Sequence, residues 1–356
     1  MSWLSELARP EIRALRAYEH AAWEPGLTRL HANELPWRTP ADGSQEGLNR
    51  YPEPHPHALT AALADFYGVP AGRVLVGRGS DEAIDLLIRS YCRAGEDAVL
   101  TCPPTFGMYA VAARIQGARL IEQPLQRSAR WGLDERALLD AARAQAALRL
   151  LFVCSPNNPT GNRLDAAAIL RVARALEGRA LVIVDEAYVE FAESPSLIAH
   201  VADTPGLVVL RTLSKAHGLA GARCGVAIAQ EEIIALLRKV IQPYAITQLT
   251  IEAVMAALTR EARELTRERI ATLRTERARL STALAATRGV RYVWPSDANF
   301  LLVEFEDAGE ALERAHRARL LVRDLRGAAV LGEALRISIG SPEQNDRLLA
   351  SLAGQA

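Results

Sequence analysis

The feature that most constrains this chain is a regular alternation of short apolar runs, turns and helical segments between about residues 74 and 229. Five of the apolar runs have the length and the β-branched content of buried strands, at 74–76, 98–101, 150–154, 181–184 and 207–210. Strands that alternate with helices pair in parallel, because each helix carries the chain back across the sheet. The pattern therefore predicts an α/β fold whose large domain has a mainly parallel sheet flanked by helices.

The chain on either side of this region has a different texture. A helical pattern from Leu4 to Tyr18 precedes an irregular stretch with several prolines, and such an arm must dock on something larger to be ordered. Strand patterns that indicate a small α/β domain occur near the other end, at 300–303, 320–323 and 335–339. We expect three parts: an N-terminal arm over 1–40 that docks on the small domain and on a partner, a large domain over 41–260, and a small C-terminal domain over 261–356.

A long helical pattern follows Pro243 and runs to about Thr287. Its leucines fall seven or eight residues apart, at Leu258, Leu265, Leu273 and Leu280. A coiled coil is one interpretation of this spacing. The apolar stripe is thin and the charges on the other faces mix in sign, so a solvated helix that bridges the two domains fits better.

The composition narrows the classes of function. The chain has 42 basic and 42 acidic residues, so it lacks the basic excess of a nucleic-acid-binding protein. No apolar run approaches the length of a membrane span, and residues 1–11 contain no signal-peptide apolar region. The four cysteines are scattered, and His55 and His57 have no matching ligands nearby, so we expect no disulfide and no metal site. A cytoplasmic protein that binds neither nucleic acid nor membrane is predicted.

The most informative polar residues follow the apolar run at 207–210. Thr212, Ser214 and Lys215 come directly after it, and Arg223 lies eight residues beyond the lysine, past a loop rich in Gly and Ala. A lysine there can form a Schiff base, while two hydroxyls and a guanidinium can hold a phosphate. Pyridoxal 5′-phosphate (PLP) requires both. A surface lysine in an ordinary loop between a strand and a helix is the alternative.

A second anion site is predicted where the run at 74–76 ends. The turn Gly77–Gly79 leads into a helix that begins at Ser80 and Asp81. Free backbone amides and the helix dipole meet at such a point and favour a phosphate. The pattern is GxGxxE and has no third glycine, so a dinucleotide site is a weak interpretation, and a plain capped helix is the other alternative.

Three other strand ends carry residues suited to the ring of such a cofactor. Asp185 directly follows the run at 181–184, where a partly desolvated carboxylate needs a cation such as a protonated pyridine nitrogen. Tyr188 lies three residues on and could donate a hydrogen bond to the cofactor's phenolic oxygen. Asn158 lies in a proline-bounded turn at the edge where open α/β sheets bind ligands. Phe106 could stack on a planar ring.

Several separated motifs resemble those of known enzymes. SPNNPTG at 155–161, VDEAY at 184–188 and the set Ser214, Lys215 and Arg223 are similar to the fold-type I PLP aminotransferases. Others resemble the histidinol-phosphate aminotransferase family more specifically: LHANELP at 30–36, LNRYPEP at 48–54, GRGSDEAIDLLIR at 77–89, CPPTFGMY at 102–109, QPYAIT at 242–247 and LRISIG at 335–340. The resemblance covers nearly the whole chain, and it implies a fold-type I PLP transferase with a small second α/β domain.

The resemblance implies a role for each matching residue. Lys215 would form the Schiff base, Asp185 would pair with the ring nitrogen, and Tyr188 with Asn158 would bind the phenolic oxygen. The residues implied to surround the cofactor phosphate are Ser80, Asp81, Thr212, Ser214 and Arg223, with Tyr51 reaching it from the partner subunit of a homodimer. Those implied to face the substrate are Tyr18, Asn33, Tyr244, Arg323 and Arg336. From the residues alone, a structural pairing of Asp324 with Arg323 is also open.

The family's reaction moves an amino group from L-histidinol phosphate to 2-oxoglutarate, which gives imidazole-acetol phosphate and L-glutamate in histidine biosynthesis. The chain departs from the family pattern at Phe106, where tyrosine is common, and at Ala17 and His31 near the substrate entrance. The first change keeps ring stacking, and the other two affect details of specificity. An aromatic or broad aminotransferase and a phosphothreonine-type decarboxylase are alternatives on the same scaffold. A PLP-binding regulatory module is disfavoured because no basic helical extension is present.

Overall fold

The large part of the fold is built on one seven-stranded sheet. The computed structural model describes residues 2–20, 23–24, 26–328 and 330–354. The strand order is β1-β7-β6-β5-β4-β2-β3. The strands are β1 (Val74–Gly77), β2 (Ala98–Thr101), β3 (Arg119–Glu122), β4 (Leu148–Cys154), β5 (Leu181–Asp185), β6 (Leu207–Thr212) and β7 (Gly225–Ile228). The five neighbouring strands β3, β2, β4, β5 and β6 all run parallel, whereas β7 is antiparallel to both β1 and β6. The predicted mainly parallel sheet is therefore confirmed, with β7 as the strand that runs against its two neighbours.

Helices cover both faces of this sheet. They are α3 (His57–Tyr67), α4 (Ser80–Tyr91), α5 (Met108–Gln116), α6 (Glu135–Arg143), α7 (Ala166–Ala175) and α8 (Glu231–Val240). Successive strand residues point to opposite faces, so alternate side chains enter two separate cores. The core containing Val153 packs against α3, α6 and α7, and the core containing Phe152 packs against α4, α5 and α8. Short 3₁₀ turns lie at Ala71–Arg73, Arg127–Ala129, Val189–Phe191 and Leu197–His200.

The parallel register of the central strands determines where a ligand can bind. Cys154 at the end of β4 is opposite Asp185 at the end of β5, and Asp185 is opposite Leu210 in β6. The segments that follow these three strands consequently leave the sheet at the same edge. This brings Asn158, Asp185 and Lys215 together although as many as 57 positions separate them in the sequence.

The small C-terminal sheet is antiparallel throughout, in the order β10-β11-β9-β8. Its elements are β8 (Val290–Val293), β9 (Phe300–Phe305), α11 (Ala308–Arg317), β10 (Arg323–Asp324), β11 (Ala334–Ser338) and α12 (Pro342–Leu352). The expected strand at 320–323 is wrong over its first three residues. Helix α11 ends at Arg317, Arg319 beyond it has a positive φ of 58°, and the Leu320 amide bonds back to the Ala315 carbonyl, so the chain here closes the helix.

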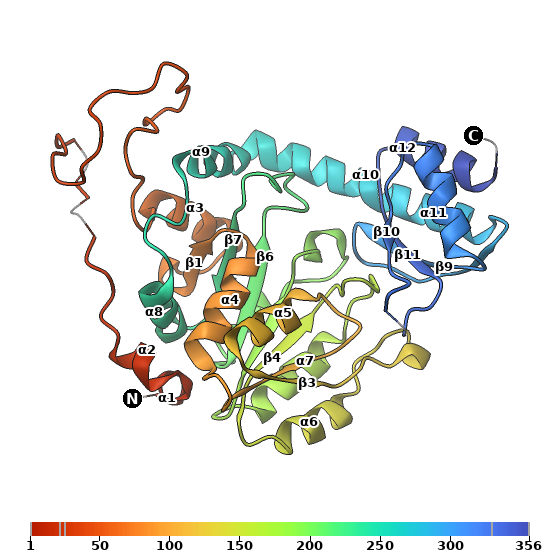
Figure 1. The fold of residues 1–356 in the computed structure, drawn as a ribbon, viewed down its shortest axis with the longest axis horizontal. Coiled ribbons are helices and arrows are strands. Elements are labelled where there is room, and N and C mark those ends of the chain that lie inside the picture. Colours follow the sequence, from red (N-terminus) through yellow and green to blue (C-terminus); the bar gives the residue numbers. More distant parts are fainter. Residues whose placement is uncertain (1, 21–22, 25, 329, 355–356) are drawn as a thin grey trace.

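The long helix expected after Pro243 is two helices, α9 (Gln248–Ala257) and α10 (Arg260–Ala285). Thr259 interrupts the pattern because it caps α10, and its hydroxyl accepts a hydrogen bond from the Ala262 amide. Figure 1 shows α9 and α10 running end to end along one side of the molecule into the small domain. Leu280 and Leu284 of α10 are buried in the small-domain core. The predicted bridging helix is confirmed in this shorter form.

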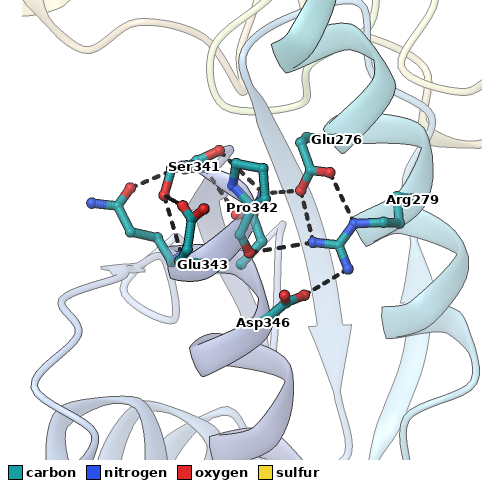
Figure 2. Close-up of polar contacts among 9 residues, drawn as sticks. Glu276, Arg279, Ser341, Pro342, Glu343 and Asp346 are labelled. Carbon is teal, nitrogen blue, oxygen red and sulfur yellow. Dashed lines mark hydrogen bonds and ion pairs between the residues drawn. The ribbon is translucent and has the colours of Figure 1, made fainter.

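A network of charged and polar side chains joins α12 to α10 (Figure 2). Arg279 donates to both oxygens of Glu276, at 2.9 and 2.7 Å, and to Asp346 of α12 at 2.7 Å. The amide of buried Asn345 also donates to Glu276, at 2.8 Å. These bonds lower the pKa of Glu276, Arg279 contributing most, so the carboxylate stays charged although its side chain is little exposed. They attach the C-terminal helix to the helix that connects the two domains.

The N-terminal arm docks first on the large domain. It begins with α1 (Trp3–Leu7) and α2 (Pro10–Ala14), not with one helix to Tyr18, because Pro10 forces the preceding Arg9 into an extended conformation. Both short helices pack on α8, and Lys239 of α8 donates to the Arg13 carbonyl. The described residues between α2 and α3 form no further helix or strand and lie beside the body (Figure 1). The expected docking on the small domain is not seen for α1 and α2, and the boundaries of the three parts stay a prediction.

Candidate active site

A cavity of about 550 Å³ opens at the carboxyl edge of the large sheet. Twelve of the residues singled out from the sequence line it: Ser80, Asp81, Phe106, Asn158, Asp185, Tyr188, Thr212, Ser214, Lys215, Arg223, Arg323 and Arg336. Ten come from the large domain and the two last arginines come from the small one. The cavity therefore lies where the two sheets approach each other, and both contribute to its wall.

Lys215 lies in the loop that follows β6, and its side chain reaches the cavity. Its Nζ lies 5.5 Å from the centre of the Tyr188 ring. Burial lowers the pKa of Lys215, and the nearby Arg336 guanidinium lowers it further, while Asp81 and Asp185 act in the opposite direction. A depressed pKa increases the fraction of neutral amine, which is the nucleophilic form.

One end of the cavity is a cup of groups whose chemistry suits a phosphate. The hydroxyl of Thr212 donates to Ser214 at 3.0 Å, and Arg223 contacts Ser214 at 3.4 Å and Asp81 at 3.2 Å. Helix α4 starts at Ser80, and its N-cap is Gly79, which has no side chain to bond the first amides. The open N-terminus, the hydroxyls and the guanidinium thus converge on one point.

Glycine at two positions allows these parts to come together. A Cβ on Gly225 of β7 would lie 2.6 Å from the Gly79 carbonyl carbon and 2.7 Å from the Ser80 amide nitrogen. Gly79 itself has a positive φ of 86°, and a Cβ there would lie 2.9 Å from Arg223. A side chain on Gly225 would push the start of α4 away from the cup, whereas one on Gly79 would be strained by the positive φ and would displace the Arg223 guanidinium.

Asp185 is fully buried beneath the cavity, with 2% of its surface exposed. The Tyr109 hydroxyl donates to one carboxylate oxygen at 2.8 Å, and the Ala187 amide donates to the other at 3.1 Å. Burial, partly offset by the hydrogen bonds from Tyr109 and Ala187, raises the pKa of Asp185 to about 6. A carboxylate in such surroundings is poised to pair with a cationic group that enters the cavity.

Asn158 links the remaining ring-binding residues. Its amide donates to the Tyr188 hydroxyl at 3.4 Å, and its carbonyl oxygen accepts from Arg336. The Arg336 guanidinium lies 5.2 Å from the centre of the Phe300 ring, and Arg323 is its cross-strand neighbour in the β10–β11 pair. Burial lowers the pKa of Arg336, and Arg323 adds to the effect. Asp324, in contrast, bonds Arg326 through both oxygens, so the structural pairing of Asp324 with Arg323 is not formed.

Four predicted residues lie outside the cavity of this chain: Tyr18, Asn33, Tyr51 and Tyr244. Tyr51 stacks on Tyr244 with ring centres 4.7 Å apart, and His20 contacts both Tyr18 and Tyr244. Glu34, next to Asn33, accepts a hydrogen bond from the Tyr51 amide at 2.7 Å. The arm and the segment before α9 thus hold these aromatic rings in one group, and their roles stay predictions.

Two residues near the predicted sites were missed from the sequence. Tyr109 is the only hydroxyl donor to Asp185 among the described residues, and it lies 76 positions away in the chain. Tyr109 follows Phe106 by three residues at the start of a helix, so the two residues lie about one helical turn apart. This spacing does not indicate which residue the Tyr109 hydroxyl bonds. Glu34 holds Arg29, Arg50 and the Tyr51 amide through one buried carboxylate. Only the folded arm brings these groups together.

The polar groups of the cavity match each polar group of PLP. The cup suits the phosphate, the buried carboxylate suits the ring nitrogen, and the Asn158–Tyr188 pair suits the phenolic oxygen. Phe106 lies at the cavity wall as a candidate for ring stacking, and Lys215 supplies the amine. Among the described residues, no group of three or more His, Cys, Asp and Glu is placed to hold a metal ion.

The fold and the site define a PLP-dependent transferase of fold type I. The family model for aminotransferase class I and II matches residues 29–352. Histidinol-phosphate aminotransferase of Stenotrophomonas maltophilia is 49% identical over 354 residues, which are 98% of this chain and 96% of that protein. The chain belongs to the class I and II aminotransferases and, within them, to the histidinol-phosphate aminotransferases.

Solved structures share this fold. Histidinol-phosphate aminotransferase of Sinorhizobium meliloti, in complex with pyridoxal-5′-phosphate, has a TM-score of 0.78 and 27% identity, over 86% of this chain and 82% of that one. L-threonine-O-3-phosphate decarboxylase of Porphyromonas gingivalis has a TM-score of 0.72 at 24% identity, over 86% and 90% of the two chains. The second likeness concerns the fold alone.

Proposed function

We propose that this enzyme transfers the amino group between L-histidinol phosphate and 2-oxoglutarate, giving imidazole-acetol phosphate and L-glutamate, as a step of histidine biosynthesis. The observation that carries the choice of substrate is the pair Arg323 and Arg336, which face each other across two strands and line the cavity that Lys215 enters. The identity of 49% to the S. maltophilia enzyme over nearly the whole chain supports the same reaction.

Bound PLP supplies an electron sink for the negative charge that develops on the substrate carbon. Lys215 would hold the cofactor through its Nζ, and its amine would also move the proton at the reacting carbon. Asp185 keeps the ring nitrogen protonated, and Tyr188 with Asn158 orients the phenolic oxygen. Phe106 supports the ring face, while the cup of Ser80, Asp81, Thr212, Ser214 and Arg223 anchors the phosphate. Each role follows from the side chain's chemistry and its place in the cavity.

The two small-domain arginines suit a phosphorylated substrate. Histidinol phosphate has no α-carboxylate, so an arginine that would hold a carboxylate is available for the substrate phosphate. A guanidinium presents paired donors that match two phosphate oxygens at once. The same pair can hold the carboxylates of glutamate when the second substrate enters, so one site serves both.

Replacing Arg336 by alanine is expected to lower kcat/KM for histidinol phosphate by the equivalent of about 2–5 kcal/mol, as for loss of one member of a buried charge pair. Replacing Arg323, which is exposed in the single chain, should lower it by a smaller amount. The KM for glutamate should rise as well. Histidinol, which lacks the phosphate, should lose much less. The measurement is kcat/KM for the phosphorylated and unphosphorylated substrates in each variant, with and without 2-oxoglutarate.

Arg326→Ala is the matched control, because Arg326 follows the same strand but pairs with Asp324 at the surface. It should leave the ratio of the two kcat/KM values unchanged. Equal losses for histidinol and histidinol phosphate in the Arg323 and Arg336 variants would mean that neither arginine binds the phosphate. Release of carbon dioxide without any need for 2-oxoglutarate would identify a decarboxylase instead.

We also propose that the enzyme works as a homodimer in the cytoplasm. The extended arm exposes large apolar side chains, with 91% of Leu30 and 76% of Trp37 accessible in the single chain. Such exposure is costly unless a partner covers it. Tyr51, half exposed in the segment between that arm and α3, lies outside the cavity of its own chain, which supports a role in the partner's cavity. In the described part of the chain, no helix has the length and apolar character needed to span a membrane.

A Tyr51 that acts across the dimer predicts a specific pattern of complementation. A heterodimer of one Tyr51→Phe subunit and one Lys215→Ala subunit, purified with two different tags, should contain one normal site and one site with both lesions. We expect about half the wild-type activity per dimer at saturating PLP. Tyr51→Phe homodimers should bind PLP more weakly, by about 1.5–3 kcal/mol for a hydrogen bond to a charged group. A heterodimer in which neither site works normally would place Tyr51 in its own subunit.

A further inference from the structure

Tyr109 contacts the Asp185 carboxylate but does not itself line the cavity. It lies on α5, is completely buried, and donates to Asp185 at 2.8 Å. Its ring is stacked on Phe152 at 4.9 Å between centres and meets the edge of Phe106 at 5.6 Å. These two contacts leave the ring little freedom, so the hydroxyl is aimed at one carboxylate oxygen by packing and not by that hydrogen bond alone.

The groups around Asp185 show what the Tyr109 hydroxyl does. Titratable groups that interact with Asp185 are Tyr109 on α5, Asp81 on α4, Lys215 after β6, Cys154 at the end of β4, and Tyr188 after β5. Burial, and then the negative charge of Asp185, raise the pKa of Tyr109 well above its ordinary value. The phenol therefore keeps its proton and can only donate to the carboxylate.

We propose that Tyr109 is a positioning residue that keeps Asp185 ionised and oriented toward the ring nitrogen of the cofactor. The proposal rests on the function proposed above, in that Asp185 faces that nitrogen. A carboxylate without a hydrogen bond at this depth would take up a proton, and a neutral carboxyl offers the ring nitrogen no charge. The Ala187 amide donates to the other oxygen, so Tyr109 is the described side chain that favours the charged form through a hydrogen bond.

The direction of the effect follows from the bond. A hydrogen-bond donor to a carboxylate stabilises the charged form and lowers the pKa of the group. Burial acts in the opposite direction, and the pKa of Asp185 is raised to about 6. Removing the hydroxyl alone should therefore raise the midpoint of Asp185 protonation further. At neutral pH, a larger fraction of the carboxyl would be protonated, and the hold on a protonated ring nitrogen would weaken.

The test compares Tyr109→Phe with Tyr91→Phe in the full-length apoenzyme. Tyr91 is equally buried, but its hydroxyl has no hydrogen-bond partner among the described residues, so it controls for loss of a buried phenol oxygen. Protonation of Asp185 is followed by infrared difference spectroscopy against pH, with Asp185→Asn as the spectrum to subtract. We expect the midpoint in Tyr109→Phe to rise by about one pH unit, and Tyr91→Phe to match wild type.

A second measurement extends the test to the cofactor. The dissociation constant of PLP is followed against pH, and the pH below which binding weakens should move upward in Tyr109→Phe by the same amount. An unchanged infrared midpoint would overturn the proposal, as would a shifted midpoint with an unchanged PLP profile. Neither readout uses the substrate, so loss of the substrate assignment in the kinetic tests would leave this result standing.

Discussion

Replacement of Lys215 by alanine is expected to abolish multiple turnover while the fold stays intact. The lysine supplies both the covalent hold on the cofactor and the proton transfer at the substrate carbon, so the variant loses two contributions at once. We expect a fall in kcat of at least about 10⁴-fold. Stability should change little, because the ammonium form is partly desolvated in the cavity and its pKa is already lowered by burial and by Arg336.

The chain offers an unusually clear control for this experiment. It has only two lysines, Lys215 and Lys239. Lys239 lies on α8 and donates to the Arg13 carbonyl of the arm, far from the cavity-lining residues. Borohydride treatment followed by mass spectrometry should attach the cofactor covalently to Lys215 in wild type and in Lys239→Ala, and to neither lysine in Lys215→Ala. Near-normal turnover in Lys215→Ala, or cofactor attached to Lys239, would refute the assignment.

Asp185→Asn is expected to bind PLP yet lose most of its rate. The amide keeps the size of the carboxyl group and can still accept from Tyr109, so the packing below the cavity is preserved. It has no charge with which to hold the ring nitrogen protonated, and the negative charge formed in the transition state is stabilised less. A charge-assisted hydrogen bond contributes about 1.5–3 kcal/mol in ordinary settings. Where charge develops in the transition state the loss is larger, and we expect about 10²–10³-fold in kcat.

Asp97→Asn is the matched control for this variant. Asp97 is also a buried aspartate, but it precedes β2 at the opposite edge of the sheet, where it pairs with Arg149 at 2.8 Å. Its replacement should lower the free energy of unfolding and leave kcat nearly unchanged. Single-turnover kinetics and PLP titration of both variants make the comparison. A rate for Asp185→Asn within a factor of two of wild type would show that the charge is not needed.

The strand ends could be predicted because they depend on short stretches of chain. An apolar, β-branched run must be buried, and the polar residue that ends it must then lie at the sheet edge, so Asp185, Asn158 and Lys215 were identifiable one motif at a time. The limits of the helices were less predictable. A single residue, Pro10 or Thr259, ended a helix whose apolar periodicity continued past it.

Contacts between distant segments could not be predicted in the same way. The sequence allowed Asp324 to pair with Arg323, but the turn after β10 carries Arg326 onto both carboxylate oxygens. Arg323 is instead placed beside Arg336 by the antiparallel register of β10 and β11. The register of a strand pair depends on how whole strands pack. Two residues that are adjacent in the sequence therefore have no advantage in forming an ion pair over two residues that the sheet brings together.

By itself, the sequence determined the class of fold, the edge of the sheet that binds a ligand and the side chains offered there, because each of these follows from local periodicity and from the residue that ends each strand. Only the tertiary structure decided that β7 runs antiparallel, that Gly225 lets α4 approach the phosphate cup, and that Tyr109 supports Asp185. Those features depend on the packing of segments up to about 150 residues apart, and close packing selects among arrangements that the local pattern leaves equally possible.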